Sequence, residues 1–167
     1  TINGYLRSGI VPKRFARFVS PEIVEAQAVV MENLVNNILP KTDADVVFRG
    51  IHIDKGFQEK TWSSMISPGT IFSDKGFVST SSDKKMAGIF GEHIIYISGA
   101  KKYGANLAAI TPMGSEYEVV FPPMTRFKTD KYDAKQKILY VTALGQQGLS
   151  QKSLVPLRPD LVEYNRY

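Results

Sequence analysis

Two glutamates separated by one residue, Glu116 and Glu118, are the first residues of this chain whose spacing suggests chemistry. The run Val119-Val120-Phe121 favours an extended backbone and Pro122-Pro123 ends it, which predicts a strand over 116–121. Residues i and i+2 of a strand project from the same face about 6–7 Å apart. Two carboxylates at that separation repel unless a cation, a ligand or water takes up the charge. The pattern alone is also typical of a solvated strand face.

An arginine and a run of hydroxyls are the other candidates. Arg49 ends a predicted buried strand over 45–50, and an anchored guanidinium presents a rigid fork of donors that matches phosphate or carboxylate. Gly50 then allows a ligand to approach the backbone closely. In Ser79-Thr80-Ser81 the first and third residues share a strand face, and their hydroxyls can hold a carboxylate and a sugar hydroxyl together. A surface arginine and a hydroxyl-rich strand edge are the structural alternatives.

Helices and short strands must position these residues. Ser20-Pro21-Glu22 predicts a helix start, with serine as N-cap and proline in the first turn. A shorter amphipathic helix is expected after Pro12. The apolar stripe that follows Glu22 has helical spacing and is broadened by Met31 and Val35, and we interpret it as core. Its other members are Ile23, Ala26, Val30, Leu34 and Ile38.

Short extended segments dominate the rest of the chain. They are predicted over 70–72, 76–81, 93–98, 116–121, 125–129 and 135–144, with a short helix over 83–90 capped by Ser82 and a long loop over 99–115. Helices followed by many strands favour an α+β fold with antiparallel sheets over alternating βαβ units.

The composition excludes several classes of function. The 167 residues, 43% of them hydrophobic, suit one domain with a sizeable core. There is no cysteine and there are only two histidines, which excludes a Cys/His zinc site. No apolar run is long enough to span a membrane, and no G-x-G-x-x-G or P-loop pattern occurs. The net charge of +5 mildly favours acidic partners, but the scattered lysines do not indicate nucleic acid.

The joint order of these features closely resembles the arginine-specific mono-ADP-ribosyltransferases of bacterial toxins. That family carries an aromatic-arginine pair, a Ser-Thr-Ser strand and a Glu-x-Glu strand, which here are Phe48-Arg49, Ser79-Thr80-Ser81 and Glu116-Tyr117-Glu118. Flanking matches include Pro68-Gly69-Thr70 and Val119-Val120-Phe121-Pro122-Pro123, and the resemblance covers residues 46–145. It implies N-terminal helices followed by a mostly antiparallel two-sheet β core of the ADP-ribosyltransferase type.

The resemblance also implies a substrate and residue roles. NAD⁺ would lose nicotinamide, and Glu118 would stabilise the developing positive charge on the ribose while Ser79, supported by Thr80 and Ser81, positions it. Glu116 would orient the acceptor guanidinium and accept its proton. Arg49 would bind the NAD⁺ phosphates or ribose, and the Gly50 backbone would contact nicotinamide.

Two further residues come from the resemblance alone. Phe90 would stack on nicotinamide, and Tyr103 would contact the protein substrate from the loop before the glutamates. No metal is required.

The expected organisation is a single catalytic domain over 1–167, with a helical part over 1–40, an NAD-binding core over 45–145 and an irregular tail over 146–167. Because the chain begins at Thr1 without a leader, a signal was removed or the chain is part of a longer protein. The resemblance implies a monomeric toxin, secreted by a bacterium and acting in the host cytosol on an arginine of a protein such as actin or a GTPase.

The sequence leaves two alternative functions open. An NAD glycohydrolase on the same fold would use water as acceptor, and a non-catalytic β-rich module would bind a partner through the loop over 99–115. A glycoside hydrolase fits poorly, because its two carboxyl groups stand on opposite sides of the scissile bond.

Overall fold

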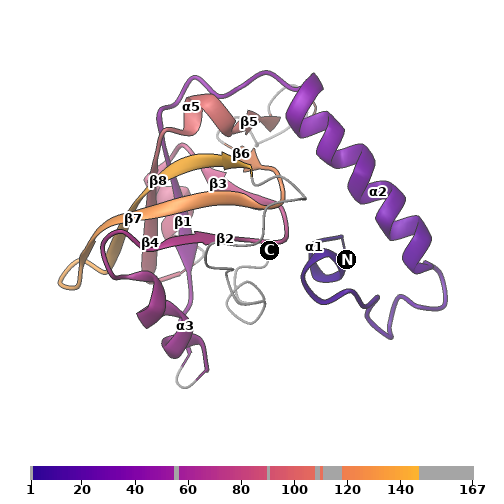
Figure 1. Cartoon of the computed structure of the whole chain (residues 1–167), viewed down its shortest axis with the longest axis horizontal. Coiled ribbons are helices and arrows are strands. Elements are labelled where there is room, and N and C mark those ends of the chain that lie inside the picture. The colour runs from indigo at the N-terminus through magenta and orange to yellow at the C-terminus, as the bar shows by residue number, and fades with distance from the viewer. Residues whose placement is uncertain (1, 55–56, 90, 108–109, 111–117, 147–167) are drawn as a thin grey trace.

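The chain begins with helices, and further helices then lie between the strands (Figure 1). The structure is a computed structural model that describes residues 2–54, 57–89, 91–107, 110 and 118–146. The helices are α1 (Ile2–Ser8), α2 (Pro21–Asn33), the π-helix η1 (Leu34–Ile38), α3 (Phe57–Met65), α4 (Lys84–Gly88) and α5 (Ala100–Tyr103). The strands are β1 (Val46–Ile51), β2 (Ile71–Ser73), β3 (Val78–Ser81), β4 (His93–Ser98), β5 (Ala105–Asn106), β6 (Glu118–Phe121), β7 (Thr125–Asp133) and β8 (Ile138–Gln146).

The start of α2 is confirmed, because the Ser20 side chain accepts a hydrogen bond from the Ile23 amide and Pro21 follows it. The interpretation of the apolar stripe as core is confirmed only near its C-terminal end, where Val35 is buried and Met31 and Leu34 pack against the same core cluster. Ile23, Val30 and Ile38 are 49%, 69% and 63% exposed. Within α2 the buried positions are instead Val24 and Ala28, which lie one turn apart and were not part of the predicted stripe.

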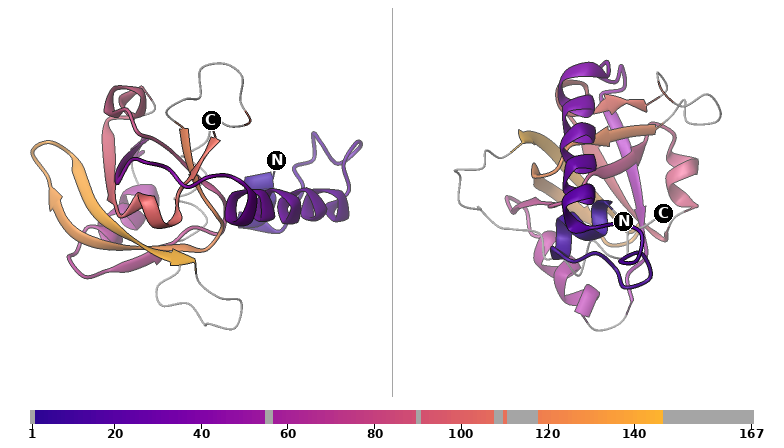
Figure 2. Two further views of the ribbon diagram at one scale, coloured as in Figure 1. Left: turned by 90° about the horizontal axis from the view of Figure 1, so that it is seen from above. Right: turned by 90° about the vertical axis from the view of Figure 1, so that its right-hand side faces the viewer.

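The position of α2 explains this outcome. Figures 1 and 2 show α2 standing beside the sheet, with α1 near its N-terminal end. A helix that packs along one edge buries only one narrow stripe. The π-helical turn of η1 then shifts the phase of the residues that follow.

The strands form one eight-stranded sheet in the order β2-β7-β8-β4-β1-β3-β6-β5. All adjacent pairs are antiparallel except β4 and β8, which confirms the mostly antiparallel sheet. The expected two sheets are therefore a single continuous one. Its two parts are joined by β1 and β3, which share a single register pair, Phe48 opposite Ser81.

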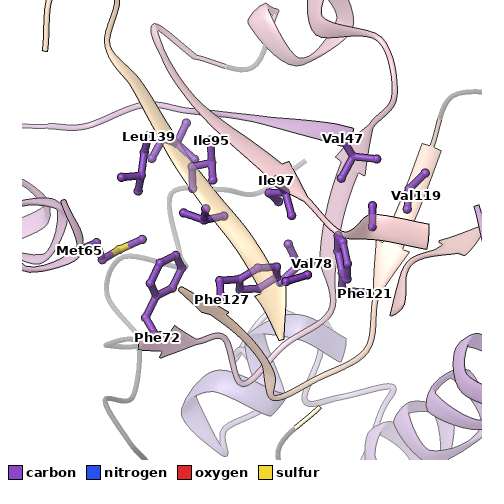
Figure 3. Packing of buried hydrophobic residues seen from close by; sticks show 14 of the residues in the cluster. Val47, Met65, Phe72, Val78, Ile95, Ile97, Val119, Phe121, Phe127 and Leu139 are labelled. Carbon is purple, nitrogen blue, oxygen red and sulfur yellow. The ribbon is translucent and has the colours of Figure 1, made fainter. Parts of the chain in front are cut away.

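The sheet curls so that its two parts face each other across the core. Phe121 of β6 and Phe127 of β7 lie near opposite ends of the strand order, yet their ring centroids are 5.4 Å apart. Figure 3 shows side chains from both parts meeting in one cluster with Met65 of α3. This curvature gives the two-layer arrangement expected of the family without breaking the sheet.

Several local boundaries differ from expectation. Asp83 rather than Ser82 caps α4, because its carboxylate accepts from the Lys85 amide. The loop predicted over 99–115 contains α5 and β5, and residues 13–18 form turns rather than a helix. Among the described helices, none is long and apolar enough to cross a membrane.

Gly91 packs so closely on β1 that an added methyl group would overlap the backbone of Ile51. Because backbone cannot move aside, we expect Gly91→Ala to lower the free energy of unfolding by about 1–3 kcal/mol. Gly4→Ala on α1 is the control, since nothing lies within 4 Å of an added Cβ there. Alanine is favoured over glycine in a helix by about 0.5–1 kcal/mol. Urea denaturation measures both variants, and equal stabilities would contradict the packing of Gly91.

Candidate active site

Arg49 lies on the core-facing side of β1 and is 5% exposed. Strand β1 is paired along its whole length with β4, which fixes the arginine backbone. The Arg49 guanidinium Nη1 donates a 2.8 Å hydrogen bond to the Ser79 carbonyl oxygen of β3. The side chain therefore links the two strands that otherwise share one register pair.

Ser79 and Glu118 meet across β3 and β6. Ser81 stands opposite Glu118 and Ser79 opposite Val120, so Ser79 and Glu118 are diagonal neighbours on one sheet face. The Ser79 hydroxyl donates a 3.1 Å hydrogen bond to Glu118 Oε1. Bonding to the charged carboxylate fixes its orientation while one oxygen keeps further acceptor capacity.

The three hydroxyls of the Ser79-Thr80-Ser81 triplet have three different partners. Thr80 is buried on the opposite face and donates a 2.7 Å hydrogen bond to the Val119 carbonyl oxygen. The Ser81 hydroxyl accepts a 3.0 Å hydrogen bond from the Asp83 amide at the start of α4. The predicted alternation of faces is confirmed, and it is Ser79 that holds the glutamate.

Gly50 packs against α4, where an added Cβ would overlap the Ala87 carbonyl. A glycine is therefore required at this position for helix packing. Its contact with nicotinamide stays a prediction.

Asp74 adds a buried charge that the sequence pattern did not indicate. It lies between β2 and β3, is 4% exposed and forms an ion pair with Arg7 of α1 at 3.1 Å. Burial raises the pKa of Asp74, while the charges of Arg7 and Arg49 and the hydrogen bond from the Gly76 amide oppose that rise. The Ser73-Asp74-Lys75-Gly76 segment has the composition of an exposed turn, so no local pattern identifies this carboxylate.

Three predicted site residues remain, of which the structure describes only Tyr103. Glu116 and Phe90 lie outside the described residues. Tyr103 lies at the end of α5 rather than in a loop, is half-buried and packs against the core cluster. Its ring contacts Gly145 of β8, where an added Cβ would lie 2.8 Å from a ring carbon.

Together the described side chains place a buried guanidinium, a hydroxyl and an oriented carboxylate on three neighbouring strands. A guanidinium binds anions, and a fixed carboxylate stabilises positive charge that develops beside it. Among the described residues no group of three or more His, Cys, Asp or Glu side chains could hold a metal ion.

The family model for NAD:arginine ADP-ribosyltransferase matches residues 29–148, a range that contains Arg49, Ser79 and Glu118. The chain belongs to this family. The mono(ADP-ribosyl)transferase SpvB of Salmonella typhimurium is 30% identical over 144 residues. That match covers 77% of this chain and 24% of SpvB, so the chain spans about a quarter of its relative.

Solved structures show the same fold. The Salmonella SpvB ATR domain has a TM-score of 0.66 and 24% identity, covering 86% of this chain and 91% of that domain. The ADP-ribosyltransferase Vis of Vibrio splendidus, in complex with agmatine, has a TM-score of 0.68 and 17% identity. That likeness covers 94% of this chain and 73% of Vis.

The buried Arg7–Asp74 pair and the exposed Lys137–Glu92 pair should differ sharply in their contribution to the free energy of unfolding. Removing one partner of a buried pair costs about 3–5 kcal/mol, so we expect Arg7→Gln to lower the free energy of unfolding by that amount. Glu92→Gln, which removes the exposed pair with Lys137, should change it by less than about 1 kcal/mol. Chemical denaturation of both variants measures the difference, and similar losses would contradict the burial of Arg7.

The stability loss in Arg7→Gln should also depend on pH. Without Arg7, burial leaves the folded pKa of Asp74 further above its ordinary value of 3.8. The folded state then binds more protons than the unfolded state above that value, so stability falls as pH rises. We expect a smaller loss at about pH 4 than at about pH 7. A loss that is the same at both pH values would show that removing Arg7 does not change the folded pKa of Asp74, and it would contradict this prediction.

Proposed function

We propose that this chain transfers ADP-ribose from NAD⁺ to the guanidinium of an arginine on a protein substrate, with release of nicotinamide. The observation that carries the proposal is the Ser79–Glu118 hydrogen bond beside buried Arg49, at the family's motif positions. The bond between the ribose C1′ and the nicotinamide nitrogen breaks, and its electron pair leaves with nicotinamide. The acceptor nitrogen then forms the new bond to C1′.

Glu118 stabilises the oxocarbenium-like ribose that forms when nicotinamide departs. Preorganised charge of this kind is worth several kcal/mol, and about 4 kcal/mol corresponds to roughly a thousandfold in rate. Ser79 supports this role, because its hydroxyl holds one carboxylate oxygen at 3.1 Å and leaves the other to bond a ribose hydroxyl.

Arg49 binds the NAD⁺ diphosphate or the adjoining ribose. Its Nη1 is engaged by the Ser79 carbonyl, which holds the plane of the guanidinium in one orientation. A planar fork held in this way meets phosphate oxygens with little loss of side-chain entropy. Gly50, Thr80, Ser81 and Phe90 complete the cofactor-binding set of the proposal.

Glu116 acts on the acceptor. A guanidinium has a pKa above about 12 and is a poor nucleophile while protonated. Glu116 orients it and takes its proton as the bond to ribose forms. The solved complex of Vis with agmatine, a small guanidine, supports a guanidine acceptor in this fold. Tyr103 is the proposed contact to the protein substrate.

The wider context is part of the proposal. The match to SpvB supports a secreted bacterial toxin that acts as a single catalytic domain in the cytosol of a host cell. Actin and GTPases are candidate protein substrates, and the net charge of +5 suits an acidic one.

The proposal is tested with NAD⁺ labelled in its ADP-ribose part and agmatine as acceptor, for wild type, Glu116→Gln and Glu118→Ala. Wild type should label agmatine. Glu116→Gln should lose transfer to a greater extent than nicotinamide release, because water needs no guanidine-binding group. Glu118→Ala should lose both by on the order of a thousandfold.

Exposed Glu92→Gln is the control and should match wild type. Nicotinamide release without labelled agmatine in wild type would favour an NAD glycohydrolase. If neither product forms and NAD⁺ does not raise the melting temperature, the chain is a binding module and the proposal fails.

A further inference from the structure

Three aromatic side chains on adjacent strands form what we term the aromatic row: Phe48 of β1, Tyr96 of β4 and Tyr140 of β8. Each stands directly opposite the next in the strand register. The ring centroids of Phe48 and Tyr96 are 5.3 Å apart, and those of Tyr96 and Tyr140 are 4.9 Å apart. A sequence neighbour of each residue belongs to the large core cluster, so the three rings lie on the sheet face turned away from that core.

The aromatic row connects the candidate active site to an exposed cation. At one end, Phe48 stands opposite Ser81, which in turn stands opposite Glu118. At the other end, Lys131 of β7 stands opposite Tyr140, and its ammonium lies 4.6 Å from the centroid of the Tyr140 ring. Lys131 is exposed. One line across the sheet therefore runs from Glu118 over the aromatic row to Lys131.

Helix α4 covers one side of the aromatic row. Ala87 of α4 packs with Ile94 and Ile138 in a small buried cluster, and the three rings pack against it while staying only partly buried. On the other side, Ser98 and Thr142 stand opposite each other and are half-buried. The row thus leaves contiguous aromatic surface in contact with water, with polar groups beside it. Surface of this kind marks sites of protein interaction.

The far end of the row is basic. Lys128 stands opposite Thr142 and, like Lys131, is exposed, so two ammonium groups border this end along β7. Asp130 between them accepts a 2.6 Å hydrogen bond from the Thr142 hydroxyl. Two lysines and one aspartate leave an excess of one positive charge, on a chain whose net charge is +5. This end therefore attracts acidic groups, and the attraction weakens with added salt because the charges are exposed.

We propose that the aromatic row is a docking surface for the protein substrate. Its occupant is an extended segment of the substrate, with apolar side chains over the rings and carboxylates at Lys131. The inference rests on the proposed function, in which the acceptor arginine lies beside Glu118. Because the row continues directly from Glu118 in the strand register, one substrate chain reaches both.

The sheet sets the distance between the acceptor arginine and the acidic residues of the segment. Strands β6 and β7 are five strand spacings apart in the sheet order, which is about 24 Å at about 4.8 Å per spacing. An extended chain covers about 3.3 Å per residue, so the acidic residues lie about seven residues from the arginine.

The test uses NAD⁺ labelled in its ADP-ribose part and synthetic peptides that contain a single arginine. A Gly-Ser spacer of about seven residues joins the arginine to Glu-Leu-Glu in one peptide and to Gln-Leu-Gln in its neutral match, each made in both chain directions. Wild type should modify the acidic peptide with a kcat/KM about fivefold above that of the neutral one, the size of one exposed charge pair. A spacer of about two residues should remove this preference, because it does not reach β7.

Substitutions on the row should affect peptides and spare agmatine, which is too small to reach it. Lys131→Glu should abolish the preference for the acidic peptide. Tyr140→Leu removes one ring and should lower kcat/KM for both peptides about threefold, the size of one aromatic contact. Lys13→Glu is the matched control, because it changes the net charge equally and Lys13 is exposed in the segment between α1 and α2. It should keep the preference.

The possible failures are distinct. If wild type does not label agmatine, the proposed function and this inference both fall. If wild type labels agmatine but shows no preference for the acidic peptide, only this inference is overturned. It is also overturned if Lys131→Glu and Lys13→Glu change the preference equally. Loss of transfer to agmatine in Lys131→Glu or Tyr140→Leu would overturn it as well, since the row would then belong to the NAD⁺ site.

Discussion

The hydrogen bond from Arg49 to the Ser79 carbonyl is the contact on which the site depends. Strand β1 carries the arginine and β3 carries the hydroxyl triplet, yet the two strands share only the register pair of Phe48 and Ser81. A junction with so few ladder bonds would let the two parts of the sheet move relative to each other. The arginine side chain supplies a second connection at this point, where the anion-binding group and the serine that orients Glu118 must be held together.

Other parts of the fold hold β1 and β3 in place at this junction. Curling of the sheet brings Phe121 and Phe127 into contact and closes the core beneath the site. Helix α4 packs on Gly50 and keeps β1 in place from the other face. Helix α1, although far away in sequence, clamps the turn that leads into β3 through Asn3 and Arg7. The buried ion pair of Arg7 and Asp74 ties α1 to that turn, although the cost of removing both charges from water offsets much of their attraction.

Local patterns in the sequence predicted those features that local physics determines. Alternation along a strand placed Ser79 and Thr80 on opposite faces, and the Ser20-Pro21 start of α2 followed from capping chemistry. Helical spacing in the sequence could not show which apolar face of α2 is buried. Ile23 and Val24 each begin an apolar stripe, and only the packing decides which faces the core.

Contacts between residues far apart in the chain could not be predicted from local sequence patterns. Arg7 and Asp74 are separated by 67 positions, and Asp74 lies in a segment with the composition of an exposed turn. The helix that carries Tyr103 was likewise expected as loop, because α5 is only Ala100–Tyr103 and is too short for apolar periodicity to show. The motif residues were identified because their joint order is specific, whereas their supporting contacts depend on the folded chain.

The most direct test of the account is a crystal structure of this chain with a non-cleavable NAD⁺ analogue. We expect the analogue's diphosphate to contact the Arg49 guanidinium, and a ribose hydroxyl to bond Glu118 while Ser79 still donates to the same carboxylate. An analogue bound away from β1, β3 and β6, or a Glu118 side chain turned away from the ribose, would contradict it.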